Sequence, residues 1–200
     1  MTSKLSIDYS NQYTTFTREE IIEAVAKTMT EERLGHVLRV EETALKLAER
    51  YEADLEKVSL AALIHDIAKQ QEDSEMRDVI ISENLDLELL QFGNAIWHGP
   101  VGAVLARRQF DIEDEEILDA IAFHTVGAPE MNRIAQILFV ADYIEPGRDF
   151  DGVEKARELA KDSLDATIHY QIKETIRKLM LDKRKIYPRA IETYNSWIIK

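Results

Sequence analysis

The chain has 200 residues, 45% of them hydrophobic, which is enough apolar material for one substantial core. It contains no cysteine, so disulfide frameworks, thiolate nucleophiles and zinc–thiolate sites are excluded, and a metal would have to bind imidazole and carboxylate groups. The formal net charge of -13 repels nucleic-acid backbones and anionic membranes, and we expect neither as a partner. A small anionic substrate would need a local pocket of cations.

The N-terminus lacks the apolar core of a signal peptide, and no stretch approaches the roughly 18 apolar residues needed to span a bilayer. We therefore expect a cytoplasmic protein. Residues 1–16 are polar and aperiodic, and we interpret them as an N-terminal extension of uncertain order. Residues 17–200 are expected to form one domain.

Apolar residues recur at helical spacing along most of that domain, and no segment has the period of a strand. The sequence therefore predicts a single-domain, all-α helical bundle. In chain order, helices are predicted from Thr17, from Thr30 to about Tyr51, from Asp54 through Lys69, once within 70–93, from Pro100, over 114–124, 131–144, 153–169 and 170–184, and from near Pro188.

His65 and Asp66 interrupt the otherwise apolar run 60–68, and the helical spacing points His65 inward. An Asp without a partner in such surroundings would meet a desolvation cost of several kcal/mol. It therefore needs a paired charge, a hydrogen-bond network or a cation. Among these, a metal ion is the simplest partner for an adjacent His and Asp.

Two more polar residues lie on or beside apolar helical stripes, His36 and Asp142. Together with His65 and Asp66 they offer two imidazoles and two carboxylates, a set that suits iron, manganese or zinc with positions left for water and substrate. Each residue alone has a structural interpretation. A single inward His is often a hydrogen-bonded core residue, and Asp142 could pair with Arg133 or Arg148.

Four motifs extend this pattern: Arg33-Leu34-x-His36-Val37, His65-Asp66-x-Ala68-Lys69, His124-Thr125-x-Gly127 and Ala141-Asp142-Tyr143-Ile144-Glu145-Pro146-x-Arg148. In this order they resemble the HD-domain metal-dependent phosphohydrolases and, more narrowly, the YqeK-type bacterial symmetrical dinucleoside tetraphosphatases. The resemblance covers about residue 30 to the C-terminus. Val126 and Ala128 depart from the Thr and the basic residue that the family often has there.

The resemblance implies an HD-domain fold in which His36, His65, Asp66 and Asp142 hold an iron-like divalent metal, with manganese or zinc as alternatives. It implies hydrolysis of diadenosine tetraphosphate, and of related dinucleotides, to two nucleoside diphosphates. It also assigns catalytic or phosphate-binding roles to a further set: Lys69, His98, His124, Thr125 and Arg148 beside Asp66 and Asp142. From their positions alone, His98 and His124 could instead supply a second metal or cap their helices.

Near the C-terminus, Lys185, Tyr187, Pro188 and Arg189 combine an aromatic ring with cations just before a predicted helix. This composition could stack a base and bind its phosphates, although Tyr187 could equally belong to the core. With the resemblance, we expect these residues to bind the nucleoside. Trp97 and Trp197 are interpreted as packing residues, and His169 as structural or exposed.

Three other functions compete with the symmetrical hydrolase. A nucleotidase acting on mononucleotides would use the same metal, a non-catalytic sensor would bind nucleotide without turnover, and a helical adaptor would leave Asp66 and Asp142 unexplained. The expected partner is a small nucleotide, and a homodimer stays open.

Overall fold

The computed structural model describes residues 7–198, and over this range every regular element is a helix. The helices are α1 (Arg18–Ala26), α2 (Glu31–Arg50), α3 (Leu55–Ile64), α4 (Asp73–Ser82), the 3-10 helix η1 (Leu87–Gln91), α5 (Asn94–Phe110), α6 (Glu115–Phe123), α7 (Arg133–Ile144), α8 (Val153–Leu159), α9 (Leu164–Leu181) and α10 (Pro188–Ser196). The predicted all-α fold is confirmed.

Side-chain caps define where several helices begin. Thr17 and Glu20 form a reciprocal capping box at α1, as their spacing predicts. Thr30 accepts a hydrogen bond from the backbone N–H of Arg33 at α2, and Asp54 accepts one from the N–H of Lys57 at α3. These polar residues satisfy backbone donors that the first helical turn leaves free.

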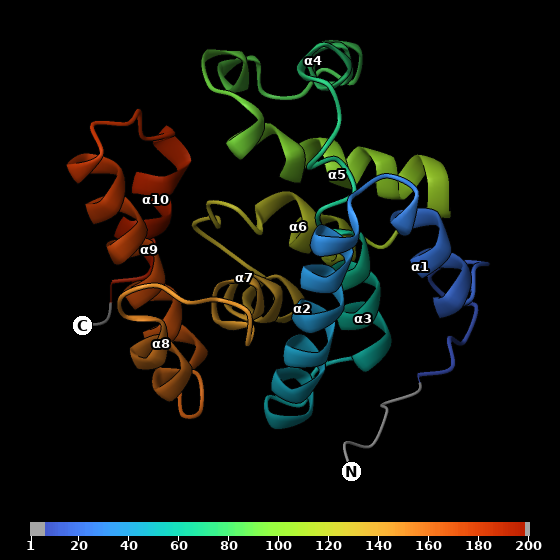
Figure 1. Cartoon of the computed structure of the whole chain (residues 1–200), viewed down its shortest axis with the longest axis horizontal. Helices are drawn as coiled ribbons and strands as arrows, with labels where there is room; N and C mark the ends of the chain where they lie inside the picture. The colour runs from blue at the N-terminus through green and yellow to red at the C-terminus, as the bar shows by residue number, and fades with distance from the viewer. Residues whose placement is uncertain (1–6, 199–200) are drawn as a thin grey trace.

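Helices α2, α3, α6 and α7 form the centre of the molecule. Helix α2 packs against α3 and α7, and α6 packs against α3, α5 and α7. Helices α8, α9 and α10 lie together on the far side of α7, whereas α4 and α5 cross the other end of the bundle (Figure 1). No helix within 7–198 combines the length and the apolar character needed to cross a membrane.

Several predicted boundaries are wrong. Helix α3 ends at Ile64, and residues 65–70 form tight turns, because Ile67 and Lys69 bond back to carbonyls three residues earlier. Helix α5 begins at Asn94 and not at Pro100, so His98 lies inside the helix. The segment 70–93 holds both α4 and η1, and the last long helix begins at Leu164 and runs without a break through 169 and 170.

The described part of the N-terminal extension packs against the body. Tyr9 hydrogen bonds Ser59 on α3 at 2.8 Å, and buried Thr14 donates to the carbonyl of Phe110 at the end of α5 at 2.6 Å. Residues 1–6 lie outside the described range. The proposed boundary at residue 17 therefore stays a prediction.

Candidate active site

Five structural elements bring their polar side chains to one buried point. His36 comes from the second turn of α2, His65 and Asp66 follow the end of α3, and all three are at most 6% exposed. The site is completed by three residues from other elements: His98 of α5, His124 at the end of α6, and Asp142 near the end of α7. The convergence that the sequence left unproved is present in the structure.

Asp66 lies at the centre of this cluster. Its Oδ2 is 3.7 Å from His36 Nε2 and 3.6 Å from His65 Nε2. Its Oδ1 is 3.4 Å from His98 Nε2 and 3.8 Å from His124 Nε2. Because α3 ends at Ile64, the Asp66 side chain lies in a turn and faces several helices at once.

Asp142 completes the opposite side of the cluster. Its Oδ1 lies 3.1 Å from His36 Nε2, and the Arg148 guanidinium bonds both this oxygen and, at 2.8 Å, the Asp142 carbonyl. Of the two cations that could have paired with Asp142, Arg148 does so, while the Arg133 guanidinium lies 6.0 Å from the centre of the Tyr51 ring.

All four imidazoles in the cluster bond an acceptor through Nδ1. His65 bonds the carbonyl of Ala62 at 2.7 Å, His98 that of Asn94 at 2.6 Å, and His124 that of Ile121 at 2.8 Å. A carbonyl oxygen can only accept, so Nδ1 carries the proton in these three rings. Their Nε2 lone pairs therefore point toward the centre of the cluster, as in metal-binding histidines. The fourth ring, His36, has Nδ1 3.1 Å from a carboxylate oxygen of Glu145.

These residues fit a divalent metal. Nε2 of His36 and of His65 is buried and has no hydrogen-bond partner among the described residues. A buried polar atom without a partner costs about 1–3 kcal/mol, which a cation would offset. Three overlapping sets have ligand atoms within 4.8 Å of one another: His36, His65 and Asp66; His65, His124 and Asp142; and Asp66, His98 and His124.

Burial and local charge set the protonation of the cluster. Burial lowers the pKa of His98 to about 3 and that of His124 to about 4, so both rings are neutral near pH 7. Burial alone would raise the pKa of Asp66 and of Asp142. The histidines around both carboxylates, and Arg148 beside Asp142, outweigh burial and hold each pKa below its usual value. Both carboxylates are therefore ionised beside the neutral rings of His98 and His124.

His98 and His124 form a close pair, with their Nε2 atoms 3.0 Å apart. Helix α5 approaches α6 this closely because residue 99 is glycine: a Cβ there would lie 2.8 Å from the Ala122 carbonyl oxygen. Two lone pairs at 3.0 Å repel unless a proton or another cation lies between them. The Lys69 ammonium is 3.3 Å from His98 Nε2.

The helix predicted to run through Lys69 stops earlier, and Asp66 and Lys69 both belong to the turn after α3. The backbone N–H of Lys69 donates to the Asp66 carbonyl at 2.9 Å, and the turn still brings the ammonium to the cluster. Burial lowers the pKa of Lys69. The expected proximity to the site therefore holds for a different structural reason.

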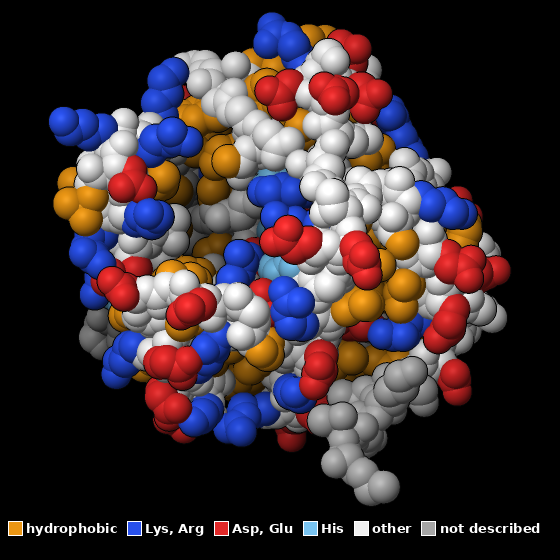
Figure 2. Space-filling view, in the orientation of Figure 1, with side chains coloured by type: hydrophobic (Ala, Val, Ile, Leu, Met, Phe, Trp, Pro, Cys, Tyr) orange, Lys and Arg blue, Asp and Glu red, His pale blue; other side chains and the backbone are white. Residues whose placement is uncertain are grey.

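Cations surround the mouth of the site. Arg33 donates to Asp66 Oδ2 at 3.0 Å, and Arg39 donates to Glu145 Oε2 at 2.7 Å. With Arg148 they line a polar cavity of about 240 Å³ that reaches His36. Figure 2 shows His side chains at the bottom of a hollow with Lys and Arg side chains around it. This is the local positive pocket that a protein of charge -13 needs for an anionic substrate.

The sequence analysis missed Arg39, and it quoted Arg33 and Glu145 within motifs without giving either a role. A usable signal was the spacing of Arg33, His36 and Arg39, since residues three apart share one face of a helix. The contact of Arg39 with Glu145 spans 106 residues and has no comparable local signal.

The C-terminal residues predicted to bind a nucleoside surround the start of α10. Tyr187 is 4% exposed and donates to Asp86 at 2.8 Å, Lys185 donates to the Gln91 carbonyl at 3.3 Å, and Pro188 is the first residue of α10. The Arg189 guanidinium lies 5.6 Å from the centre of the Phe123 ring, next to His124. Tyr187 and Arg189 line a cavity of about 250 Å³ between α5 and α6.

Thr125, directly after His124, has a buried hydroxyl without a hydrogen-bond partner among the described residues. The chain then turns at Gly127, whose φ of +70° suits glycine, and a Cβ there would lie 2.7 Å from the Thr193 methyl group of α10. This turn packs the loop between α6 and α7 against α10.

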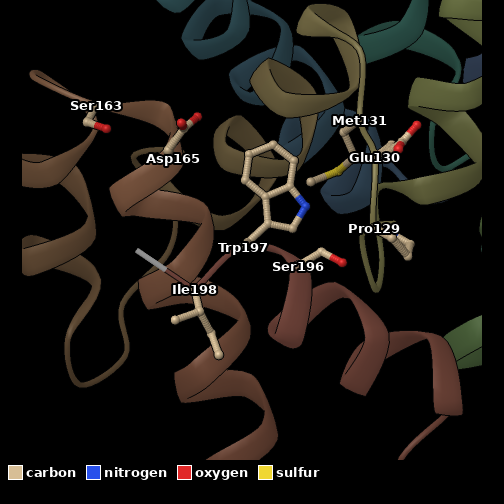
Figure 3. Close-up of a pocket in the computed structure, with 8 residues that line it drawn as sticks. All are labelled: Pro129, Glu130, Met131, Ser163, Asp165, Ser196, Trp197 and Ile198. Carbon is tan, nitrogen blue, oxygen red and sulfur yellow. The ribbon is translucent and has the colours of Figure 1, made fainter. Parts of the chain in front are cut away.

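Trp97, Trp197 and His169 lie outside the cluster. Trp97 is buried and bonds the carbonyl of Leu89, and His169 stacks on Tyr194 of α10. Trp197 donates to the carbonyl of Ala128 and lines an open cavity of about 580 Å³ with Asp165 (Figure 3). None of the cluster residues lines this larger cavity.

Comparison with known proteins agrees with this geometry. The HD domain family model matches residues 33–147. A Bacillus subtilis (strain 168) protein named bis(5'-nucleosyl)-tetraphosphatase, symmetrical, is 41% identical over 182 residues, which is 91% of this chain and 97% of that protein. A Staphylococcus aureus protein of the same name is 40% identical over 171 residues, 84% of this chain and 88% of that protein.

A solved structure is also similar. It is the crystal structure of a Clostridium acetobutylicum protein described as a predicted HD superfamily hydrolase involved in NAD metabolism. Its TM-score is 0.88 at 33% sequence identity, and the match covers 91% of this chain and 97% of that chain. The chain therefore belongs to the HD-domain family and, within it, to the group of proteins named symmetrical bis(5'-nucleosyl)-tetraphosphatases.

Proposed function

We propose that this protein hydrolyses diadenosine tetraphosphate, and related dinucleoside polyphosphates, symmetrically to two nucleoside diphosphates. The observation that carries the proposal is the buried cluster of inward-facing imidazoles and ionised carboxylates below a rim of arginines, in a chain that aligns almost end to end with relatives of that name. A cytoplasmic location and a homodimer stay predictions.

Four side chains are proposed to hold a divalent metal: His36, His65, Asp66 and Asp142. A bound divalent ion of this kind supplies water activation near neutral pH and offsets charge on phosphate oxygens. Iron is the ion that we propose, with manganese and zinc as alternatives that the same donors accept. The buried, unpaired Nε2 atoms of His36 and His65 support this assignment.

The remaining polar residues are proposed to bind and orient the polyphosphate. Arg33, Lys69 and Arg148 present cations around the cluster, and Arg148 can form a two-pronged contact with a phosphate. His98 and His124 donate to phosphate from Nε2 only after taking up a proton, because their Nδ1 protons are committed to carbonyls. A bound polyanion favours that uptake.

The free hydroxyl of Thr125 is proposed to contact a phosphate, and the segment Lys185, Tyr187, Pro188 and Arg189 to bind the nucleoside. The Arg189 contact with Phe123 supports this part of the proposal, since it brings the start of α10 next to His124. The aromatic ring and the cations are groups that bind bases and phosphates.

Product analysis tests the function. The metal-loaded protein should convert diadenosine tetraphosphate to ADP alone, and Asp66→Asn and Asp142→Asn should each abolish the reaction. Asp165→Asn, an exposed carboxylate at the other cavity, is the matched control and should retain full turnover. ATP plus AMP would refute symmetrical cleavage, and turnover of mononucleotides alone would favour the nucleotidase.

A further inference from the structure

Glu145 is a buried carboxylate that directly contacts a proposed metal ligand. It lies in the turn just after α7, its residue is 1% exposed, and Oε1 is 3.1 Å from His36 Nδ1. The other three imidazoles of the cluster bond backbone carbonyls through Nδ1. Among these four rings, His36 alone has a charged acceptor behind it.

Every close polar neighbour of the Glu145 carboxylate is a donor. Oε2 accepts from Arg39 Nε at 2.7 Å and from the backbone N–H of Gly147 at 2.5 Å, while Oε1 lies 3.1 Å from His36 Nδ1 and accepts a longer bond of 3.5 Å from Arg39 Nη2. Gly147 leaves room for the arginine, since a Cβ at this position would lie 2.6 Å from Arg39 Nη2. Oε2 thus holds the two shortest contacts and fixes the orientation of the carboxylate, and His36 Nδ1 is the nearest partner of Oε1.

We propose that Glu145, held by Arg39, is a positioning residue that keeps the His36 proton on Nδ1 and so presents the Nε2 lone pair to the metal. A carboxylate behind a metal-binding imidazole fixes the tautomer and raises the basicity of the ligating nitrogen. The inference rests on the proposed metal site. The four proposed ligands alone give no role to Glu145, nor to its contact between α2 and the turn after α7, and the inference assigns one to both.

The donor pattern distinguishes this role from simple support of the turn. In Glu145→Gln, the amide oxygen should take the position of Oε2, because Arg39 and the Gly147 N–H both donate there and need an acceptor. The amide N–H₂ group then faces His36 Nδ1. That contact favours the tautomer with the proton on Nε2, where it blocks the metal. Glu145→Gln should therefore bind metal no better than Glu145→Ala, whereas a supporting role predicts that Gln is milder than Ala.

Arg157 provides a matched control. It donates to the carbonyls of Ile144, Glu145 and Arg148 at 2.8–2.9 Å, so it holds the same turn through its backbone without touching His36. Arg157→Gln loosens the turn and leaves the carboxylate contact in place. Its metal affinity should stay within about threefold of wild type.

The test is a Zn²⁺ titration of the full chain against a competing chelator, with cooperative unfolding as the check that each variant is folded. Glu145→Gln and Glu145→Ala should each raise the Kd about 10- to 100-fold. In ¹⁵N-histidine spectra of the metal-free protein, the neutral His36 ring should carry its proton on Nδ1 in wild type and on Nε2 in Glu145→Gln.

Three results would overturn the proposal. The first is a Kd for Zn²⁺ that is unchanged in both Glu145 variants. The second is a Glu145→Gln protein that binds Zn²⁺ clearly more tightly than Glu145→Ala and keeps the wild-type tautomer of His36. The third is a loss of metal affinity in Arg157→Gln as large as that in Glu145→Gln. If wild type itself bound no Zn²⁺, the proposed metal site would fail, and this inference with it. If instead the wild type and both Glu145 variants bound Zn²⁺ equally well, the metal site would stand and only the role of Glu145 would fail.

Discussion

Replacing Gly99 by alanine tests whether the close approach of α5 and α6 supports the site. The new Cβ would lie 2.8 Å from the Ala122 carbonyl oxygen and 3.3 Å from that of Ile121. Alanine gains about 1 kcal/mol in helix propensity over glycine. Overlap with backbone that cannot rotate away costs about 1–3 kcal/mol. The clash is the larger effect, so a net destabilisation of about 1 kcal/mol is expected.

The variant should unfold about 2–4 °C lower than wild type in a thermal scan. Turnover of diadenosine tetraphosphate should fall about 10- to 100-fold, because the shift of α5 moves His98 away from His124. Gly102→Ala is the graded control: its Cβ would lie 3.3 Å from the His65 carbonyl oxygen, and its losses should be smaller. A Gly99→Ala protein as stable and as active as wild type would refute this reasoning.

Three further changes test other parts of the account. Arg18→Met should lower the free energy of unfolding in urea by about 3–5 kcal/mol, because it leaves the buried Glu41 carboxylate without its cation. The double variant Arg18→Met with Glu41→Leu should recover most of that loss. Equal stability of the single and the double variant would contradict this. In metal-free protein, the folded pKa values of His98 and His124 are depressed to about 3 and 4, so the unfolded chain binds more protons than the folded protein below about pH 6.5. The melting temperature should therefore fall as the pH is lowered from 7 to 4. A melting temperature that does not change with pH would contradict the depressed pKa values of these two histidines. Lys69→Met should lower kcat/KM about 10- to 100-fold by removing a phosphate contact, and an unchanged value would exclude that role.

The ligand cluster was readable from the sequence because its residues break a local rule. Asp66 interrupts a run of buried apolar residues, and Asp142 directly follows the buried apolar stretch 137–141 of α7. Helical spacing pointed His65 inward and placed His36 on or beside an apolar stripe. Polar residues that local pattern cannot accommodate are expected at functional sites. The prediction that these residues converge needed no knowledge of the loops between them.

The turn after α3 was not readable, because the apolar pattern continues through it. Ile67 and Ala68 are as buried as residues of α3 itself, so periodicity alone extends the helix to Lys69. The start of α5 was hidden for a related reason. Pro100 is a typical first-turn residue, yet here it lies deeper in the helix, which gives up one backbone hydrogen bond.

The supporting contacts of the site depend on tertiary structure. Glu145 meets His36 across 109 residues of sequence, and the Arg148 contact with Asp142 depends on the turn that follows α7. The start of α10 meets the end of α6 through an Arg189 side chain that lies over the Phe123 ring. Such pairings follow from how helices pack, which residue patterns within one helix do not specify.

The position of the bound metal decides whether His36, His65, Asp66 and Asp142 form the metal site. Crystals of the protein grown with Mn²⁺ and ADP, measured at the manganese absorption edge, would place the ion by anomalous scattering. The account predicts a peak at ligand distance, about 2.0–2.2 Å, from Nε2 of His36 and His65 and from oxygens of Asp66 and Asp142. No peak at these four residues, or one held by His98 and His124 without His36 and Asp142, would contradict it.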